Sequence, residues 1–264
     1  MIFSRRFLGA AALAAGLGLA FAGAALAKAD PSPSLAATTA PPSLRPNRRD
    51  AAFVLAAAGL TALVATRDRA WLAQATDNHT RFALDLAADA KRMGDPVSMG
   101  VPLLLADLAS RAFHAQPVAA ASERIAASCA AAGVVSLLIK EAAGRERPDE
   151  TADPGRFKPF SGRDAFPSGH STVAFAFAAS LDAETGARWV PMLAYPAAAL
   201  TAWSRVRDRR HWPSDVVAGA AVGAGVAWRA DAYARARWPL GLVLVPILPQ
   251  AGGSGMGASV LVRF

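Results

Sequence analysis

The sequence predicts an all-α protein, built as a compact bundle of about six core helices. The chain is 53% hydrophobic and only 18% charged, a balance typical of a helical protein that is deeply buried or lies next to a membrane. Apolar segments of helical length alternate with polar loops, and no strand-like alternation occurs before the end of the chain. The core helices are expected at 51–66, 98–112, 118–143, 169–182, 189–206 and 214–235, with a further helix near 68–92.

The first 27 residues have the features of an export signal. Arg5 and Arg6 form a charged start, residues 7–24 are apolar, and the small-x-small pattern at 25–27 is typical of a cleavage site. The arginine pair also resembles a twin-arginine signal. We therefore expect a signal peptide over 1–27 that exports the chain to the periplasm, with an uncleaved anchor helix as the alternative.

Composition divides the rest of the chain into three parts. Residues 28–50 are rich in Pro, Ser and Thr, which predicts an extended linker. Residues 51–238 form the predicted helical domain. Residues 239–264 are expected to form a tail, in which Gly241–Leu248 and Ala258–Phe264 pair as a short β-hairpin around a Gly-rich segment.

Two observations bear on whether the helices cross a membrane. A spanning helix needs about 20 mostly apolar residues. Most of the apolar segments here are shorter than that between charges or prolines, and Asp107 lies inside one of them. Three crossings before Lys140 would also place that residue in the cytoplasm if the mature chain starts outside. These observations favour a compact periplasmic domain, and an integral inner-membrane protein is the alternative.

The formal net charge of +8 suits an anionic partner such as a phosphorylated substrate or an anionic lipid. No run of Lys and Arg is interleaved with aromatic residues, so binding to nucleic acid is not predicted. The single cysteine, Cys129, excludes an internal disulfide and is expected to be a small buried residue.

A first polar block, KEAAGRERP, follows the apolar run that ends at Ile139. Lys140 and Arg147 are seven residues apart, so on a continuous helix both project from one face. Gly144 weakens such a helix and Pro148 ends it. The block is either a pair of anion-binding cations or a solvated basic helix end, which the helix dipole also favours.

A second block, FPSGHS, precedes the apolar helix expected from residue 169. Ser168 is a natural N-cap, and Gly169 allows the backbone to come close to a ligand. Free N–H groups at such a helix start bind anions. His170 would then stand beside the anion, although a simple helix cap with a surface histidine is the alternative interpretation.

A third block contains Arg205, His211 and Asp215. The histidine and the carboxylate are one helical turn apart, with Pro213 at a plausible first helical position. A carboxylate that accepts from one imidazole nitrogen leaves the other free as a nucleophile. The guanidinium of Arg205 can bind phosphate oxygens through two N–H groups. The three blocks together predict a pocket for a doubly charged oxyanion.

Metal binding is the rival use of histidine and aspartate. The four histidines, at 79, 114, 170 and 211, are far apart in the sequence and show neither HxH nor HExxH spacing. No metal or other cofactor is therefore expected.

Taken together, K-x6-RP at 140–148, PSGH at 167–170 and SR-x5-H-x3-D at 204–215 resemble the signature of the type 2 phosphatidic acid phosphatase superfamily. That superfamily includes class A acid phosphatases and vanadium haloperoxidases. The resemblance covers about residues 50–235, and the stretch at 157–160 is also similar to exported bacterial members. It implies the helical fold of these enzymes and a phosphatase that needs no metal.

The resemblance also implies a role for each matching residue. His211 would attack phosphorus and form a phosphohistidine, with Asp215 orienting it, and His170 would protonate the leaving group and then activate water. The phosphoryl oxygens would be held by Lys140, Arg147, Ser168, Gly169 and Arg205. The expected substrate is a lipid phosphate or a soluble phosphate ester. Two alternatives stay open: a vanadium-dependent haloperoxidase and a non-catalytic phosphate-binding envelope protein.

Overall fold

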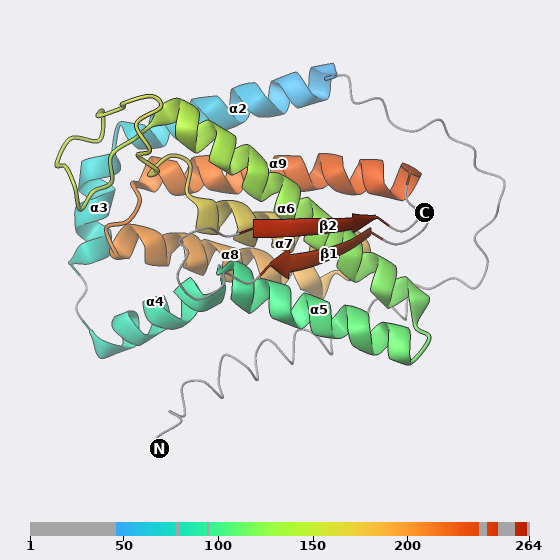
Figure 1. Ribbon diagram of the computed structural model, residues 1–264. Coiled ribbons are helices and arrows are strands. Elements are labelled where there is room, and N and C mark those ends of the chain that lie inside the picture. The colour runs from blue at the N-terminus through green and yellow to red at the C-terminus, as the bar shows by residue number, and fades with distance from the viewer. Residues whose placement is uncertain (1–45, 78–79, 94, 238–241, 248–256, 263–264) are drawn as a thin grey trace.

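The computed structural model describes residues 46–77, 80–93, 95–237, 242–247 and 257–262, and within these ranges the chain is a helical bundle with one small β-hairpin (Figure 1). The all-α class predicted from the sequence is confirmed. The helices are α2 (Arg48–Ala65), α3 (Asp68–Thr76), α4 (Arg81–Met93), α5 (Pro96–Ala112), α6 (Gln116–Ala143), α7 (Gly169–Thr185), α8 (Trp189–Arg207) and α9 (Pro213–Arg237).

The predicted C-terminal hairpin is present. Strands β1 (Leu242–Ile247) and β2 (Gly257–Val262) pair in antiparallel register, with Leu242 opposite Val262 and Ile247 opposite Gly257. Strand β1 lies inside the predicted bounds, whereas β2 begins at Gly257, one residue before the predicted start. The predicted signal peptide (1–27) and most of the predicted linker (28–50) lie outside the described residues.

Two predicted helix boundaries were wrong. The expected single helix near 68–92 is two helices, because α3 ends at Thr76 and the next helix begins only at Arg81. Helix α2 starts at Arg48, inside the predicted linker. The reason is a capping box: the Asn47 side chain accepts from the N–H of Asp50, while the Asp50 carboxylate accepts from the N–H of Asn47.

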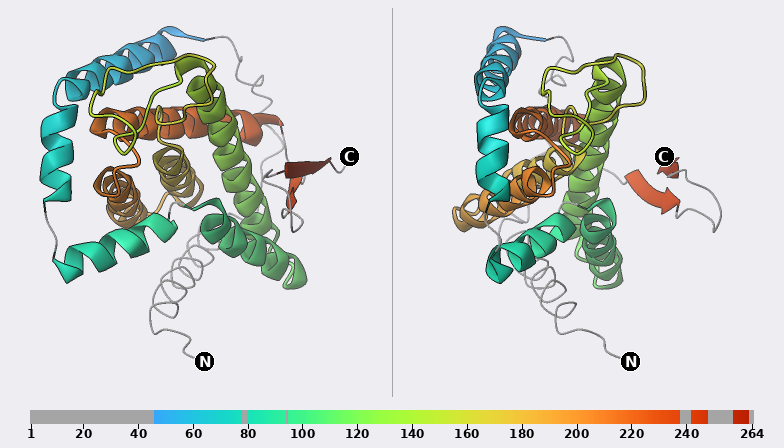
Figure 2. Two further views of the ribbon diagram at one scale, coloured as in Figure 1. Left: turned by 60° about the vertical axis from the view of Figure 1, so that its left-hand side comes forward. Right: turned by 90° about the vertical axis from the view of Figure 1, so that its left-hand side faces the viewer.

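Helix α7 is the centre of the bundle, and it packs against α6, α8 and α9 (Figure 2). Two glycines of α9 allow its close approach. A Cβ atom on Gly219 would lie 2.5 Å from the backbone oxygen of Ser168, and one on Gly223 would lie 2.1 Å from the backbone oxygen of Thr172. Because any larger residue would collide with the α7 backbone, these glycines set the distance between the starts of the two helices.

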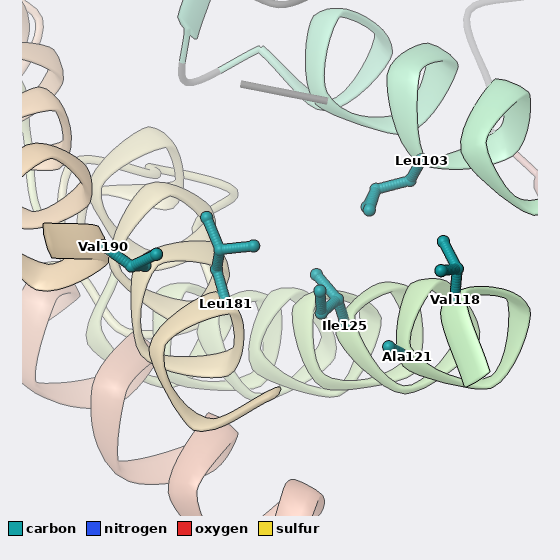
Figure 3. Close-up of a cluster of buried hydrophobic side chains, with 6 residues drawn as sticks. All are labelled: Leu103, Val118, Ala121, Ile125, Leu181 and Val190. Atoms are coloured by element: carbon teal, nitrogen blue, oxygen red, sulfur yellow. The ribbon is translucent and has the colours of Figure 1, made fainter. Parts of the chain in front are cut away.

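A hydrophobic cluster joins α5, α6, α7 and α8 at the end of the bundle where α6 begins and α7 finishes (Figure 3). Ile125 of α6 is fully buried and is surrounded by the other members of the cluster. They are Leu103, Val118, Ala121, Leu181 and Val190. The rest of the core is built largely from alanine, which lets the helices pack closely but buries little apolar area per residue.

The outer faces of the long helices carry many large apolar side chains. In α2, α5, α6, α8 and α9 at least one such residue is half exposed or more. Examples are Leu55 (73%), Leu105 (60%), Leu138 (67%), Met192 (73%) and Trp228 (51%). Exposed large apolar side chains on this many helices suit a surface that contacts a membrane or another apolar partner.

The ends of four helices and one long loop meet at one end of the bundle (Figure 1). Helices α6 and α8 finish there, and α7 and α9 begin there. The loop over residues 144–168 covers this end and is joined to the α8–α9 connection, since Arg209 donates to the carbonyl of Pro148 and Arg210 pairs with Asp149. All three polar blocks of the sequence lie in these segments.

Candidate functional site

The start of α7 has the geometry of an anion-binding helix N-terminus. Ser168 precedes the helix as its N-cap, and its hydroxyl accepts from the N–H of Ser171 at 3.4 Å, as predicted. Its own N–H donates to the backbone carbonyl of Asp215 at 2.9 Å, which ties this turn to the start of α9. The N–H groups of Gly169 and His170 belong to the first helical turn, where no intrahelical acceptor exists.

Lys140 and Arg147 converge, but not along a continuous helix. Helix α6 ends at Ala143, and Gly144 follows it with φ +56°. The expectation that both cations project from one helical face was therefore wrong, because the left-handed cap turns the chain into the loop. Both reach residue 164 instead: Lys140 Nζ donates to the backbone carbonyl of Asp164, and Arg147 Nη2 donates to its carboxylate at 2.5 Å.

His211 is buried at the centre of the site, directly before α9. Its Nδ1 lies 2.7 Å from the backbone carbonyl of Ala165, which can only accept, so Nδ1 carries the hydrogen. The neutral ring then has its lone pair on Nε2. Burial holds the pKa of His211 well below the ordinary value, and the positive charge of Lys140 acts in the same direction. The site therefore contains a neutral imidazole with one free nitrogen, as nucleophilic attack requires.

The predicted hydrogen bond between His211 and Asp215 is absent. Their closest nitrogen and oxygen atoms are 3.9 Å apart. The Asp215 carboxylate instead accepts from the N–H of Trp212 at 2.7 Å and from the guanidinium of Arg145. Asp215 closes the turn that carries His211, and the Ala165 carbonyl fixes the tautomer.

Arg145 and Asp68 belong to this site, and the sequence analysis missed both. The guanidinium of Arg145 is 3% exposed and bridges Asp68, at 2.7 Å, to Asp215. Asp68 also accepts from the N–H and the hydroxyl of Ser214, at 2.8 and 2.7 Å. Arg145 lies inside the first polar block, and this position could have indicated that it belongs to the site. Nothing in the sequence links Asp68 to the blocks.

Three cations lie close enough to His211 to disfavour its protonated form, and two of them also act on His170. The charges of Lys140, Arg147 and Arg205 all act on His211, and those of Arg205 and Lys140 also act on His170. Arg205 is buried at the end of α8 and pairs with Asp208 at 3.2 Å. The structure thus brings all the predicted site residues to one end of the bundle.

Buried donors without acceptors indicate what this pocket holds. Among the described residues, no acceptor lies within hydrogen-bond distance of the buried Nε of Arg147 or the buried Nε of Arg205. An unsatisfied buried donor on a charged group costs well over 1 kcal/mol. An oxyanion bound between the two guanidinium groups would satisfy both. Within the described part of the chain, no group of three or more His, Cys, Asp or Glu side chains forms a metal cluster.

The part of the chain that carries the three polar blocks is similar to known proteins. Residues 124–239 match the family model of the PAP2 superfamily. Lipid A 1-phosphatase of Rhizobium etli is 37% identical over 138 residues, which is 46% of this chain and 57% of that protein. The enzymes of the same name from Rhizobium johnstonii and Porphyromonas gingivalis are each 43% identical, over 100 and 82 residues, or 35% and 30% of this chain. Those segments are 39% and 16% of the two relatives. The chain therefore spans 57% of the Rhizobium etli enzyme and less than half of each of the other two.

One solved structure is similar in fold. It is described as the first transmembrane PAP2 type phosphatidylglycerolphosphate phosphatase, from Bacillus subtilis. The TM-score is 0.57 at 18% sequence identity, and the match covers 72% of this chain and 98% of that one.

Proposed function

We propose that the chain is a metal-independent lipid phosphatase acting through a phosphohistidine intermediate, because its residues 124–239 match the model of the PAP2 superfamily. The observation that carries this proposal is the buried neutral His211, whose Nδ1 is held by the Ala165 carbonyl, with the charges of Lys140, Arg147 and Arg205 acting on its ring. Among the described residues no hydrogen-bond partner is found for its Nε2. Phosphoryl transfer asks mainly for positioning and for charge stabilisation around the equatorial oxygens. Three fixed cations and a helix N-terminus supply both.

In the first step, Nε2 of His211 attacks phosphorus while the bond from phosphorus to the leaving oxygen breaks. His170 must be protonated to give that oxygen a proton: burial and the charge of Arg205 lower its pKa to about 4, and the negative charge of the bound phosphate acts in the opposite direction. The protonated imidazole then donates to the leaving oxygen, and the freed alcohol departs. The Ala165 carbonyl keeps its bond to Nδ1–H, so the positive charge that develops on the ring is stabilised. In the second step His170 removes a proton from water, the hydroxide attacks phosphorus, and the bond to Nε2 breaks to release phosphate.

Two features support a lipid as the alcohol part of the substrate. The relatives act on lipid A, and the similar structure is that of a phosphatidylglycerolphosphate phosphatase. The protein also contains a cavity of about 1060 Å³ between α2, α6 and α9, with apolar walls, that extends to Arg145 and Ser214 at the site end. Apolar residues that line it include Phe53, Ala57, Val135, Phe166, Ala221 and Val222.

A substrate panel tests the proposed activity. The purified chain in detergent is expected to release phosphate from lipid A 1-phosphate, phosphatidylglycerophosphate or phosphatidate with a higher kcat/KM than from p-nitrophenyl phosphate. Orthovanadate resembles the transition state and should inhibit at concentrations at least about 100-fold below KM. Phosphate release from none of these esters would refute a phosphatase. Halide oxidation with vanadate and peroxide in the same preparation would instead support the haloperoxidase alternative.

We propose further that the bundle is embedded in a membrane, the second of the two locations that the sequence left open. Helix Val118–Ala143 is long and apolar enough to cross a membrane, and only 22% of its most apolar window is buried inside the protein. A second span would result if the bent pair Arg48–Ala65 and Asp68–Thr76 crosses as one. The exposed leucines of α2, α5 and α6 would then face lipid rather than water.

Extraction from cell membranes tests the embedding. The full chain is expected to stay in the membrane pellet after washing with alkaline carbonate and to be released only by detergent. A soluble control protein exported by the same cells should appear in the supernatant after osmotic shock. Recovery of this chain with that control would favour the periplasmic domain instead.

A further inference from the structure

The carboxylate of Asp164 lies on the cation that is expected to hold the substrate phosphate. Its Oδ2 is 2.5 Å from Nη2 of Arg147, and its backbone carbonyl accepts from Nζ of Lys140. Residue 164 therefore contacts both cations of the first block. We infer that Asp164 is an affinity-determining residue of this site, whose carboxylate competes with phosphate for Arg147; the inference rests on the proposed function.

The position of Asp164 is fixed by its neighbour. Ala165 is fully buried, its N–H donates to the carbonyl of Arg145 at 3.0 Å, and its own carbonyl holds Nδ1 of His211. The backbone at 164 is thus anchored one residue away from a bond that the proposed nucleophile makes. The carboxylate cannot drift away from the site as the tip of a free loop would.

The Asp164 side chain itself is free to move. It is 47% exposed, whereas the side chain of Arg147 is 20% exposed. A rotation about its side-chain bonds can therefore move the carboxylate into water while the backbone stays in place. The backbone of Arg147 is held in place by the bond from its N–H to the Glu150 carboxylate at 3.0 Å.

Charge determines the consequence. A carboxylate and a phosphate dianion at the same guanidinium repel each other, so phosphate must displace Asp164 in order to bind. Breaking the ion pair between Arg147 and Asp164 costs free energy. This cost weakens the binding of both the substrate phosphate and the product phosphate. An exposed ion pair of this kind contributes up to about 1 kcal/mol, which is roughly a fivefold change in a dissociation constant. The benefit of this arrangement is faster release of product.

Replacement of Asp164 by asparagine tests the inference, since the amide oxygen can still accept from Arg147 but carries no charge. Calorimetry on the detergent-solubilised full chain should show inorganic phosphate and orthovanadate binding about three- to fivefold more tightly to Asp164→Asn than to the wild type. A matched control is Asp149→Asn in the same loop. Asp149 pairs with Arg210 at 2.8 Å rather than with a proposed phosphate ligand, and its replacement should leave both affinities unchanged.

Unchanged or weaker binding in Asp164→Asn would overturn the inference, because a residue that merely orients Arg147 predicts a loss of affinity. The absence of measurable phosphate binding to both proteins would also overturn it. Binding is measured without turnover, so the inference about Asp164 and the proposed phosphatase activity can be rejected independently of each other. Tighter binding without hydrolysis of any ester would reject the phosphatase and keep the inference, whereas hydrolysis with unchanged binding would do the reverse.

Discussion

Replacement of His211 by alanine is expected to reduce phosphate release by at least about 1000-fold, because it removes the atom that attacks phosphorus. The cations and the N-terminus of α7 remain in this variant, so phosphate should still bind. The loss should therefore appear in kcat rather than in the affinity for inorganic phosphate. Initial rates on the best substrate of the panel, together with phosphate binding by calorimetry, measure the two effects.

The phosphoenzyme gives an independent readout for the same variant. Wild-type protein quenched in alkali during turnover of a radiolabelled ester should retain the label on histidine, and the His211→Ala protein should retain none. His114 provides a matched histidine outside the site. It is exposed and has φ 57°, so His114→Asn tests a histidine replacement with a residue that tolerates this backbone conformation. Near-normal turnover in His211→Ala would mean that another group is the nucleophile.

The parts of the site that follow local rules were predictable from the sequence. The role of Ser168 as N-cap and the start of α9 at Pro213 both follow from the preferences of these residues at helix starts. The three blocks could be assigned to one pocket because phosphate chemistry needs cations and histidines together. The helical bundle followed from the lengths of the apolar segments.

The contacts that join distant segments were not predictable in the same way. Asp68 pairs with Arg145 across 77 residues, and no spacing rule connects them. The bond between His211 and the Ala165 carbonyl crosses 46 residues and replaces the predicted bond to Asp215. Such contacts depend on how the loop over residues 144–168 folds back onto the α8–α9 connection, which a single sequence does not specify.

The sequence also did not predict which face of each helix points outward. Alanine-rich helices with leucine on several sides have little amphipathic pattern, so the sequence could not show which side faces the core. In the structure, Leu137 and Leu138 of α6 are exposed while Ala132 and Ser136 are buried. This inversion, with large apolar residues outside and small or polar residues inside, is what membrane helix packing favours.

The buried network around Arg145 leads to the largest expected effect on stability. Asp68 and Asp215 are fully buried, and both face this single guanidinium. In Arg145→Met the two carboxylates would lose the cation that both of them contact. Removing one partner of a buried ion pair typically costs about 3–5 kcal/mol, and here it leaves two carboxylates uncompensated. Thermal unfolding in detergent, followed by circular dichroism, should show a large fall in Tm.

A second replacement separates this charge effect from loss of packing. In Arg145→Met with Asp68→Asn only one carboxylate remains without a cation, so the double variant should be more stable than Arg145→Met alone. Arg124→Met at the other end of the bundle is a matched control. Arg124 makes a two-point bond to a single carboxylate, Glu184, at 3.0 and 2.7 Å, so Arg124→Met removes this cation from one buried carboxylate rather than from two. Its loss should be smaller. Equal losses of Tm in the two arginine variants would show that packing rather than buried charge determines the stability of the Arg145 network. Arg145 would then have no special role in holding Asp215 near His211.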